Sequence, residues 1–523
     1  MSSLLLSVTT QIFIYPTLYF GRSKKVTANV LTARTDAYFK TMKKSLIILT
    51  ATAVAVGVLP LTACKKEHKQ TSKYVICADY DDESNRLTAT CDFTFFNDTD
   101  NELTELKFNL WGNAYRQDAK VKPISESSRA KAYYDGASYG GQSVQNVENC
   151  GGWEVGGEDE NILTVTLNEP VYPDCTAQVS IEYTLDLAKV NHRTGVTQST
   201  VNLGNFYPVL CVYTTEGFAE NPYYCYGDPF VSECADYEVT FKLPREYALA
   251  TSGKEISRTV AGEVTSCTFE LKNARDFAAV LSKEFKTVTR QTSGCDVTVY
   301  YVGEEQPDKQ LDVACESIDY FTRTFGEYAY PTLSVVITPL CVSGMEYPAL
   351  TMISDDLSED DGIYTIVHEN AHQWWYAMVG NDQVNCAWQD EGLAEYSTMC
   401  FFENYSAYGI TRTSALGNAI KSYRAYYSVY NQIFGKADTT MTRCLKDFSG
   451  EYEYVNVAYN KGLLAFESVR TAMGDKKFFN ALKSYFEANK FKIASQEELI
   501  SHFAALHDVE GIFNSYIEGK VVI

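Results

Sequence analysis

The segment that most constrains this chain is His368-Glu369-Asn370-Ala371-His372. It lies in residues 363–379, where apolar side chains recur at helical spacing, so the sequence predicts a helix over this range. At 3.6 residues per turn, His368 and His372 lie one turn apart on one face, and both imidazoles can reach one metal ion at about 2.0–2.1 Å. Glu369 lies beside His368, where it can face a water molecule rather than the metal. The spacing therefore predicts a metal centre and favours zinc.

A catalytic zinc site usually needs a third protein ligand and keeps its fourth position for water or substrate. The candidate is Glu391, 19 positions after His372, at the start of a second predicted helix over residues 391–402. An isolated glutamate would be interpreted as a solvated acidic residue. Beside the histidine pair, the interpretation of Glu391 as a metal ligand is favoured instead. The other four histidines, at positions 68, 192, 502 and 507, lie apart from the motif and are interpreted as structural or solvated.

The combined motifs resemble the M1 family of zinc metallopeptidases, of the aminopeptidase N type. The resemblance rests on H-E-x-x-H followed by eighteen residues and Glu391. It also rests on residues 343–347 (SGMEY), which resemble the family's G-x-M-E-N loop, and on residues 459–462 (YNKG), which resemble its Y-x-K-G segment. Residues 205–208 and 227–230 look like parts of its N-terminal β-domain. The resemblance covers the chain from about Tyr74 onward.

The resemblance implies one zinc ion held by His368, His372 and Glu391. Bound zinc lowers the pKa of a water molecule to about 7, which makes a nucleophile available near neutral pH. Glu369 would act as the general base, taking a proton from the attacking water and passing one to the leaving amine.

The resemblance also implies how a peptide substrate is held. Tyr459 would donate its hydroxyl to the oxyanion of the tetrahedral intermediate. Glu346 would bind the free α-ammonium group, and Gly344 and Met345 belong to the same substrate loop. Tyr347 stands where the family commonly has Asn, so we expect different main-chain hydrogen bonds at that point. We also expect an open cleft that admits longer peptides, because only 64 residues follow Tyr459.

The two halves of the chain differ in periodicity. From about residue 74 to residue 283, alternating and β-branched segments predict antiparallel strands. The predicted strands are residues 87–96, 162–167, 177–187, 237–243 and 265–271, with one more at 297–302. The predicted helices are residues 312–325, 363–379, 391–402, 459–473 and 476–489, and a capping box at residues 495–498 starts another. We therefore expect an α+β multidomain protein, with an N-terminal antiparallel β-domain (74–283) and a thermolysin-like (gluzincin) α/β catalytic domain (284–523) ending in helices.

The first 73 residues read as an export signal and tether. From Met42, which we expect to be the true start, Lys43 and Lys44 precede an apolar run that ends in a small-residue sequence closing on Cys64. This sequence resembles the lipobox of bacterial lipoproteins. Residues 1–63 are thus predicted to be an upstream segment and signal, with Cys64 the lipid anchor and residues 64–73 a tether. A plain transmembrane helix is the alternative, although the run is short for a span.

The charge balance limits the possible partners. The chain has 45 Lys and Arg against 67 Asp and Glu, a net charge of −22, so its field repels phosphate backbones and nucleic-acid binding is not expected. The sequence predicts a membrane-anchored, extracytoplasmic zinc aminopeptidase acting on peptides, at a bacterial cell surface or in the periplasm. Two alternatives stay open, a zinc endopeptidase on the same scaffold and a non-catalytic surface binding protein.

Overall fold

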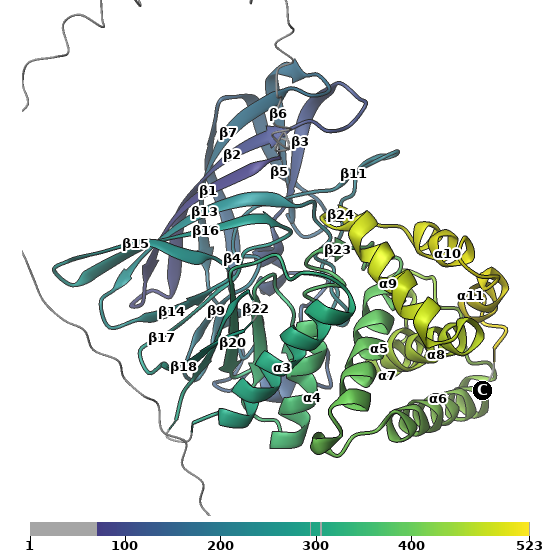
Figure 1. The fold of residues 1–523 in the computed structure, drawn as a ribbon. Coiled ribbons are helices and arrows are strands. Elements are labelled where there is room, and N and C mark those ends of the chain that lie inside the picture. Colours follow the sequence, from purple (N-terminus) through teal and green to yellow (C-terminus); the bar gives the residue numbers. More distant parts are fainter. Residues whose placement is uncertain (1–70, 293, 304–305, 522–523) are drawn as a thin grey trace, which may run out of the picture. The chain divides into compact units, whose positions relative to one another are not determined.

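The computed structural model describes residues 71–292, 294–303 and 306–521, and residues 70–523 form one compact unit. A β-rich part comes first and a part that combines one sheet with most of the helices follows (Figure 1). The first part contains β1 Lys73–Asp81, β2 Arg86–Phe96, β3 Leu103–Asn109, η1 Trp111–Tyr115, α2 Arg129–Ala132, β4 Gly141–Glu148, β5 Cys150–Gly156, β6 Ile162–Val171, β7 Thr176–Asp186, β8 Thr194–Val196, β9 Val201–Leu203, β10 Val209–Leu210, β11 Tyr213–Thr214, β12 Gly217–Phe218, β13 Ala235–Pro244, β14 Ala248–Thr251, β15 Lys254–Ala261, β16 Val264–Ala274 and β17 Ala279–Ser282.

The second part begins with strands and continues with helices. It contains β18 Lys286–Gln291, β19 Asp296–Tyr301, α3 Asp308–Thr324, β20 Thr332–Thr338, β21 Gly344–Met345, β22 Leu350–Ser354, α4 Glu359–Ala371, β23 Val379–Gly380, α5 Trp388–Asn404, η2 Ser406–Tyr408, α6 Arg412–Phe434, η3 Leu445–Asp447, α7 Glu451–Tyr454, the π-helix η4 Val455–Asn460, α8 Lys461–Met473, α9 Asp475–Asn489, β24 Lys492–Ile493, α10 Gln496–Ala504 and α11 Glu510–Ile517.

Two sheets build most of the β-rich part. A seven-stranded sheet has the order β15-β16-β13-β1-β2-β7-β4, and a four-stranded sheet has the order β10-β3-β6-β5. Buried and exposed residues alternate along β2, as expected for a strand with one face on the core. The rings of Phe93 in β2 and Phe108 in β3 lie 5.5 Å apart, so the two sheets share this core.

A five-stranded sheet, β18-β19-β20-β22-β21, supports the helix that carries the histidine pair. Helices α3 and α4 pack on this sheet and on each other, and α5 packs on α4 (Figure 1). Helix α8 packs on α5, and helices α6, α9 and α11 pack on α8. The predicted α+β class is confirmed.

Every predicted strand and helix is found, but three details were wrong. The prediction of a purely antiparallel first half fails because β1 pairs in parallel with β13. The predicted helix over 363–379 ends at Ala371, since Nδ1 of His372 lies 2.9 Å from the carbonyl oxygen of Trp375 and the chain turns there to make that contact. Residues 455–460 form a π-helix ahead of α8 rather than its first turn. Helices α6 and α11 were not predicted.

The predicted capping box is present. The Ser495 hydroxyl accepts from the backbone N–H of Glu498, whose carboxylate accepts from the N–H of Ser495. The domain boundary near Lys283 stays a prediction. The signal, the Cys64 anchor and most of the tether lie outside the described residues. Among the helices that the structure describes, none has the length and apolarity needed to cross a bilayer.

Candidate active site

Helix α4 presents the two histidines from a well-defined start. The Ser358 hydroxyl caps the helix by accepting from the backbone N–H of Asp361, and acidic residues in the first turn favour the positive end of the helix dipole. His368 lies in the last turn and His372 is the C-cap residue. Both are buried, and their rings lie 4.9 Å apart. The expected one-turn spacing therefore places both imidazoles on the same side of the helix.

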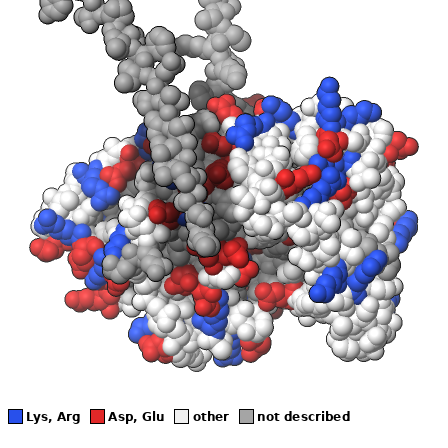
Figure 2. All heavy atoms as spheres, turned by 60° about the horizontal axis from the view of Figure 1, so that its bottom comes forward, with Lys and Arg blue, Asp and Glu red and all other residues white. Residues whose placement is uncertain are grey.

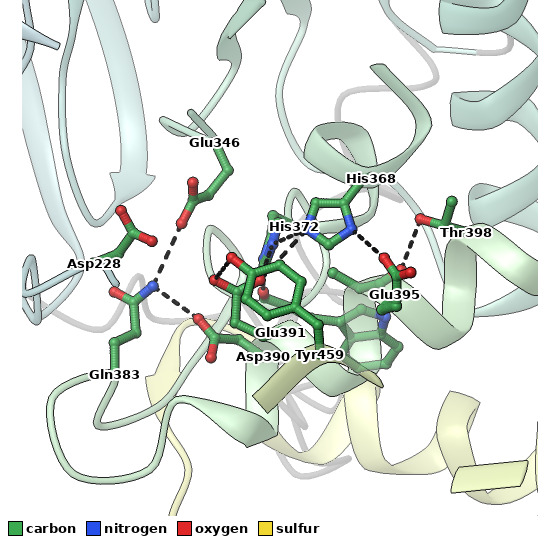
Figure 3. Close-up of polar contacts among 12 residues, drawn as sticks. Asp228, Glu346, His368, His372, Gln383, Asp390, Glu391, Glu395, Thr398 and Tyr459 are labelled. Atoms are coloured by element: carbon green, nitrogen blue, oxygen red, sulfur yellow. Dashed lines mark hydrogen bonds and ion pairs between the residues drawn. The ribbon is translucent and has the colours of Figure 1, made fainter. Parts of the chain in front are cut away.

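Glu391, in the first turn of α5, completes a triangle with the histidine pair (Figure 3). The Nε2 atoms of His368 and His372 lie 3.2 Å apart, and they lie 3.4 and 3.3 Å from Oε2 of Glu391. A tetrahedral zinc ion with bonds of about 2.0–2.1 Å needs ligand atoms about 3.3 Å apart. The three side chains thus fit one zinc ion.

The shifted pKa values of the two histidines and Glu391 also indicate a cation-binding site. Burial lowers the proton affinity of both imidazoles, but hydrogen bonds to Glu391 and Glu395 outweigh it and raise the pKa of His368 to about 10. The pKa of His372 is also raised against burial, by the charges of Glu346 and Glu391. Burial opposes ionisation of Glu391, yet hydrogen bonds from both histidines hold its pKa well below the usual range. A divalent cation would replace the protons that these groups share.

The other nitrogen of each imidazole has a partner that fixes the ring. Nδ1 of His368 lies 3.1 Å from Oε2 of Glu395, and Nδ1 of His372 lies 2.9 Å from the carbonyl oxygen of Trp375. The Tyr364 hydroxyl donates to the other oxygen of Glu395. Such contacts orient metal-ligating histidines. The sequence analysis missed Glu395, although its position one helical turn after Glu391 was a usable signal.

Glu369 lies beside the metal triangle, and its position depends on Gly344. It is buried, and its Oε2 has no hydrogen-bond partner. A Cβ atom at Gly344 would lie 2.3 Å from Oε1 of Glu369, so only glycine leaves room for this carboxylate. Burial raises the pKa of Glu369 to about 8. The charge of His368 lowers this pKa, and the charge of Glu346 raises it. An unpartnered carboxylate of this kind is suited to accept a proton from water.

Tyr459 reaches the triangle from the π-helix. Its hydroxyl donates to Oε1 of Glu391 at 2.6 Å, and the Tyr454 hydroxyl donates to the same oxygen at 3.3 Å. Burial and the charge of Glu391 raise the pKa of Tyr459, so its hydroxyl keeps its proton and can donate it. Gly392 and Gly462 let α5 and α8 approach closely, because a Cβ atom at Gly462 would lie 2.7 Å from the Cα of Gly392.

The 343–347 loop enters the site from one edge of the five-stranded sheet. Strand β21 pairs with β22 through Gly344 and Met345, and this pairing directs Glu346 into the cavity. Gly344 also lines the cavity, whereas Met345 is fully buried outside its walls. The hydroxyl of Tyr347 donates to Oδ1 of Asn205 at 3.0 Å, so this departure from the family loop ties the loop to the β-rich part.

Two further carboxylates lie near Glu346, and the sequence analysis assigned neither. Asp228 lines the cavity and pairs with Arg193 at 2.5 Å. Asp390 lies behind the cavity wall, where Nε2 of Gln383 donates to it at 2.8 Å and to Glu346 at 3.5 Å (Figure 3). The result is a buried, strongly acidic end of the cavity, which suits a cationic group.

The metal triangle, Glu369, Glu395, Tyr459, Glu346 and Asp228 border one cavity of about 360 Å³. It is lined from both parts of the chain, by residues 192–193 and 225–228 of the first and by residues 341–344, 346, 454–455 and 459–460 of the second, among others. His192, interpreted from sequence as structural, is buried in this wall with Nδ1 2.5 Å from the Tyr115 hydroxyl. The site is thus a buried His-His-Glu triangle that fits one zinc ion, set within an α+β scaffold.

Comparison with known proteins shows which family the second part of the chain resembles. Residues 309–516 match the family model described as "Peptidase family M1 domain". This region, which holds the metal triangle, Glu346 and Tyr459, is thus similar to peptidase family M1.

Named relatives are distant. Aminopeptidase M1-B of Oryza sativa subsp. japonica is 23% identical over 307 residues, which cover 55% of this chain and 34% of the relative. Human endoplasmic reticulum aminopeptidase 1 is 22% identical over 306 residues, covering 55% of this chain and 32% of the relative. The chain thus spans about a third of the length of these relatives.

Solved structures agree with the fold over more of the chain. The M1 zinc metallopeptidase from Deinococcus radiodurans has a TM-score of 0.62 and 16% identity, covering 87% of this chain and 94% of that chain. A mutant of that enzyme bound to a Tyr-Ser-Ala substrate gives a TM-score of 0.59 and 17% identity, with the same coverage of both chains.

Proposed function

We propose that this protein is a zinc-dependent aminopeptidase that removes N-terminal residues from peptides. The observation that carries the proposal is the position of Glu346, a buried carboxylate in the same cavity as the metal triangle. A free α-ammonium group bound there would present the first peptide bond of a substrate to the zinc site. The aminopeptidase names of the distant relatives support this proposal.

The chemistry would be divided among a few side chains. His368, His372 and Glu391 would hold zinc, which when bound supplies a Lewis acid that polarises the peptide carbonyl and activates water. Glu369 would accept a proton from the attacking water and deliver one to the leaving amine. The Tyr459 hydroxyl, already at the edge of the metal triangle, would donate to the oxyanion as the carbonyl carbon becomes tetrahedral.

Comparing substrates with free and blocked N-termini tests the proposal. The purified, zinc-loaded protein should cleave alanyl p-nitroanilide and should not cleave its N-acetylated counterpart, because the acetyl group removes the charge that Glu346 binds. Glu369→Gln should abolish cleavage of the free substrate, since the amide cannot take a proton, and it serves as the blank.

The alternatives give different results. Equal cleavage of internal bonds in free and N-acetylated peptides would indicate an endopeptidase. No cleavage of any peptide by protein with a full complement of zinc would indicate a binding protein that keeps the fold.

We also propose, on the sequence around Cys64 alone, that a lipid on this cysteine anchors the protein at the outer side of a membrane. Metabolic labelling with palmitate should then label the wild-type chain but not Cys64→Ser. Equal labelling of both chains would contradict the anchor.

A further inference from the structure

The cavity extends beyond the groups used in the proposed reaction. Its outer walls come from three segments that are distant in the sequence: Pro123, Ile124, Ser125 and Ser128; Cys225 and Tyr226; and Cys341 and Val342. Glu451 of α7 and Val455 of the π-helix that follows it also line the cavity. Most of these walls are apolar, so Glu451 is the charged group on this side.

The whole cavity carries an excess of negative charge. Its walls include the carboxylates of Asp228, Glu346, Glu369, Glu391, Glu395 and Glu451. Arg193 is the guanidinium among its described lining residues, and it is buried against Asp228 at 2.5 Å. A bound zinc ion offsets two of the charges. Acidic residues are also visible in the recessed middle of the face drawn in Figure 2. The cavity therefore favours cationic ligands over neutral ones of the same size.

Glu451 is an exposed residue that lines the cavity, where its carboxylate can bind a cation. Among the described residues it forms no ion pair, and the Ser127 hydroxyl donates a hydrogen bond of 3.4 Å to its Oε2. Burial raises the pKa of the Cys225 thiol, and the charge of Glu451 adds to this shift. Burial also raises the pKa of Cys341 to about 11. The charges of Arg193 and Lys131 lower this pKa, whereas the charge of Glu451 raises it further. The charge of Glu451 thus acts on both facing walls.

The wall formed by Cys225 and Tyr226 continues along the chain to Asp228 at the amine-binding end. Cys225 precedes Asp228 by three residues, so their Cα atoms are at most about 10 Å apart. A long side chain on a residue whose α-ammonium group binds Glu346 could extend from that end towards Glu451. Its methylene groups would lie against Ile124, Tyr226 and Val342, and its terminal charge would face the carboxylate.

From this arrangement we infer that Glu451 selects substrates whose N-terminal residue is lysine or arginine. The inference rests on the proposed aminopeptidase function and names its substrate class. Norleucine has the same unbranched stem as lysine without the charge, so it separates the contribution of Glu451 from that of the apolar walls.

The test compares kcat/KM of the full, zinc-loaded chain for lysyl, arginyl, norleucyl and alanyl p-nitroanilides. We expect the wild type to prefer lysine and arginine over norleucine by about two- to fivefold, as for an ion pair with an exposed carboxylate. Glu451→Gln should bring the lysine-to-norleucine ratio close to one, and Glu451→Lys should invert it. Glu126→Gln is the matched control, because it removes a charge from the neighbouring loop but outside the cavity walls, and its ratio should equal that of the wild type.

Two results would overturn the inference. One is a wild type that cleaves the norleucyl substrate at least as well as the lysyl one. The other is a lysine preference that Glu451→Gln leaves unchanged. Both results count only if the zinc-loaded protein measurably cleaves the alanyl substrate. If it does not cleave that substrate, the proposed function itself is wrong.

Discussion

At the scale of single residues, the buried cation Lys461 shows how a motif residue can serve the site without entering it. It follows Tyr459 by two positions, is fully buried, and its Nζ donates to the carbonyl oxygens of Thr439 and Tyr516. These contacts hold the start of α8 against two other segments. Lys461 therefore fixes the backbone from which Tyr459 projects.

The burial of Lys461 predicts a pH dependence of stability. Burial, reinforced by the charge of Arg443, lowers the pKa of Lys461 from 10.5 to about 7 in the folded chain. Between these pH values the unfolded chain binds more protons, so the free energy of unfolding should increase as pH rises from 7 to 10. Each pKa unit corresponds to about 1.4 kcal/mol, so an increase of a few kcal/mol is expected.

Thermal unfolding of the wild type and Lys461→Met, followed from pH 6 to pH 10, isolates this contribution. As pH rises above 7, the unfolding temperature of the wild type should increase relative to that of the variant. Below pH 7 the difference between the two unfolding temperatures should be constant. A difference that stays constant over the whole range would contradict the shifted pKa.

The residues that bind or react were predictable to different degrees. His368 and His372 follow from their one-turn spacing along one helix. Glu391 was a candidate from its place in the next helix, and its role and that of Glu369 came from the resemblance to a family motif. Asp228 could not be predicted, since it lies far from the zinc motif in sequence and reaches the cavity only through the packing of the two parts of the chain.

At the scale of elements, the crossing of α5 and α8 joins the metal ligand to the tyrosine. Glu391 comes directly before Gly392, and Tyr459 comes three residues before Gly462. The contact between the two glycines therefore sets the distance between Glu391 and the Tyr459 hydroxyl. The periodicity of the sequence predicted both helices but not the π-helical turn, because one extra residue in a turn leaves the apolar pattern almost unchanged.

Gly462→Ala should separate these helices. The added Cβ would meet backbone atoms of Gly392, which cannot rotate away, so we expect a loss of about 1–3 kcal/mol in stability and at least a tenfold loss in kcat/KM. Gly417→Ala in α6 is the matched control, since its Cβ would meet no atom within 4 Å and alanine favours a helix. Equal activity of the two variants in kinetic assays would show that the close crossing does not position Tyr459.

At the scale of the whole molecule, the site depends on a buried arginine that joins the two parts of the chain. The Arg275 guanidinium donates to the carbonyl oxygens of Ser232, Tyr376 and Lys492. Tyr376 lies just after the zinc helix and has a φ of 150°, an uncommon conformation that this contact stabilises. The division into a β-rich and a helical part was predictable from periodicity, whereas this connection was not, because a single Arg carries no sequence pattern.

The central claim is that His368, His372 and Glu391 form one zinc centre on which peptide cleavage depends. The most direct measurement is the zinc content of the purified chain by mass spectrometry, for the wild type, Glu391→Ala and Glu369→Gln. One zinc ion per chain is expected in the wild type and in Glu369→Gln, which keeps all three ligands but lacks the base, and far less in Glu391→Ala. Zinc retained in full by Glu391→Ala, or lost from Glu369→Gln, would contradict the assignment of ligand and base.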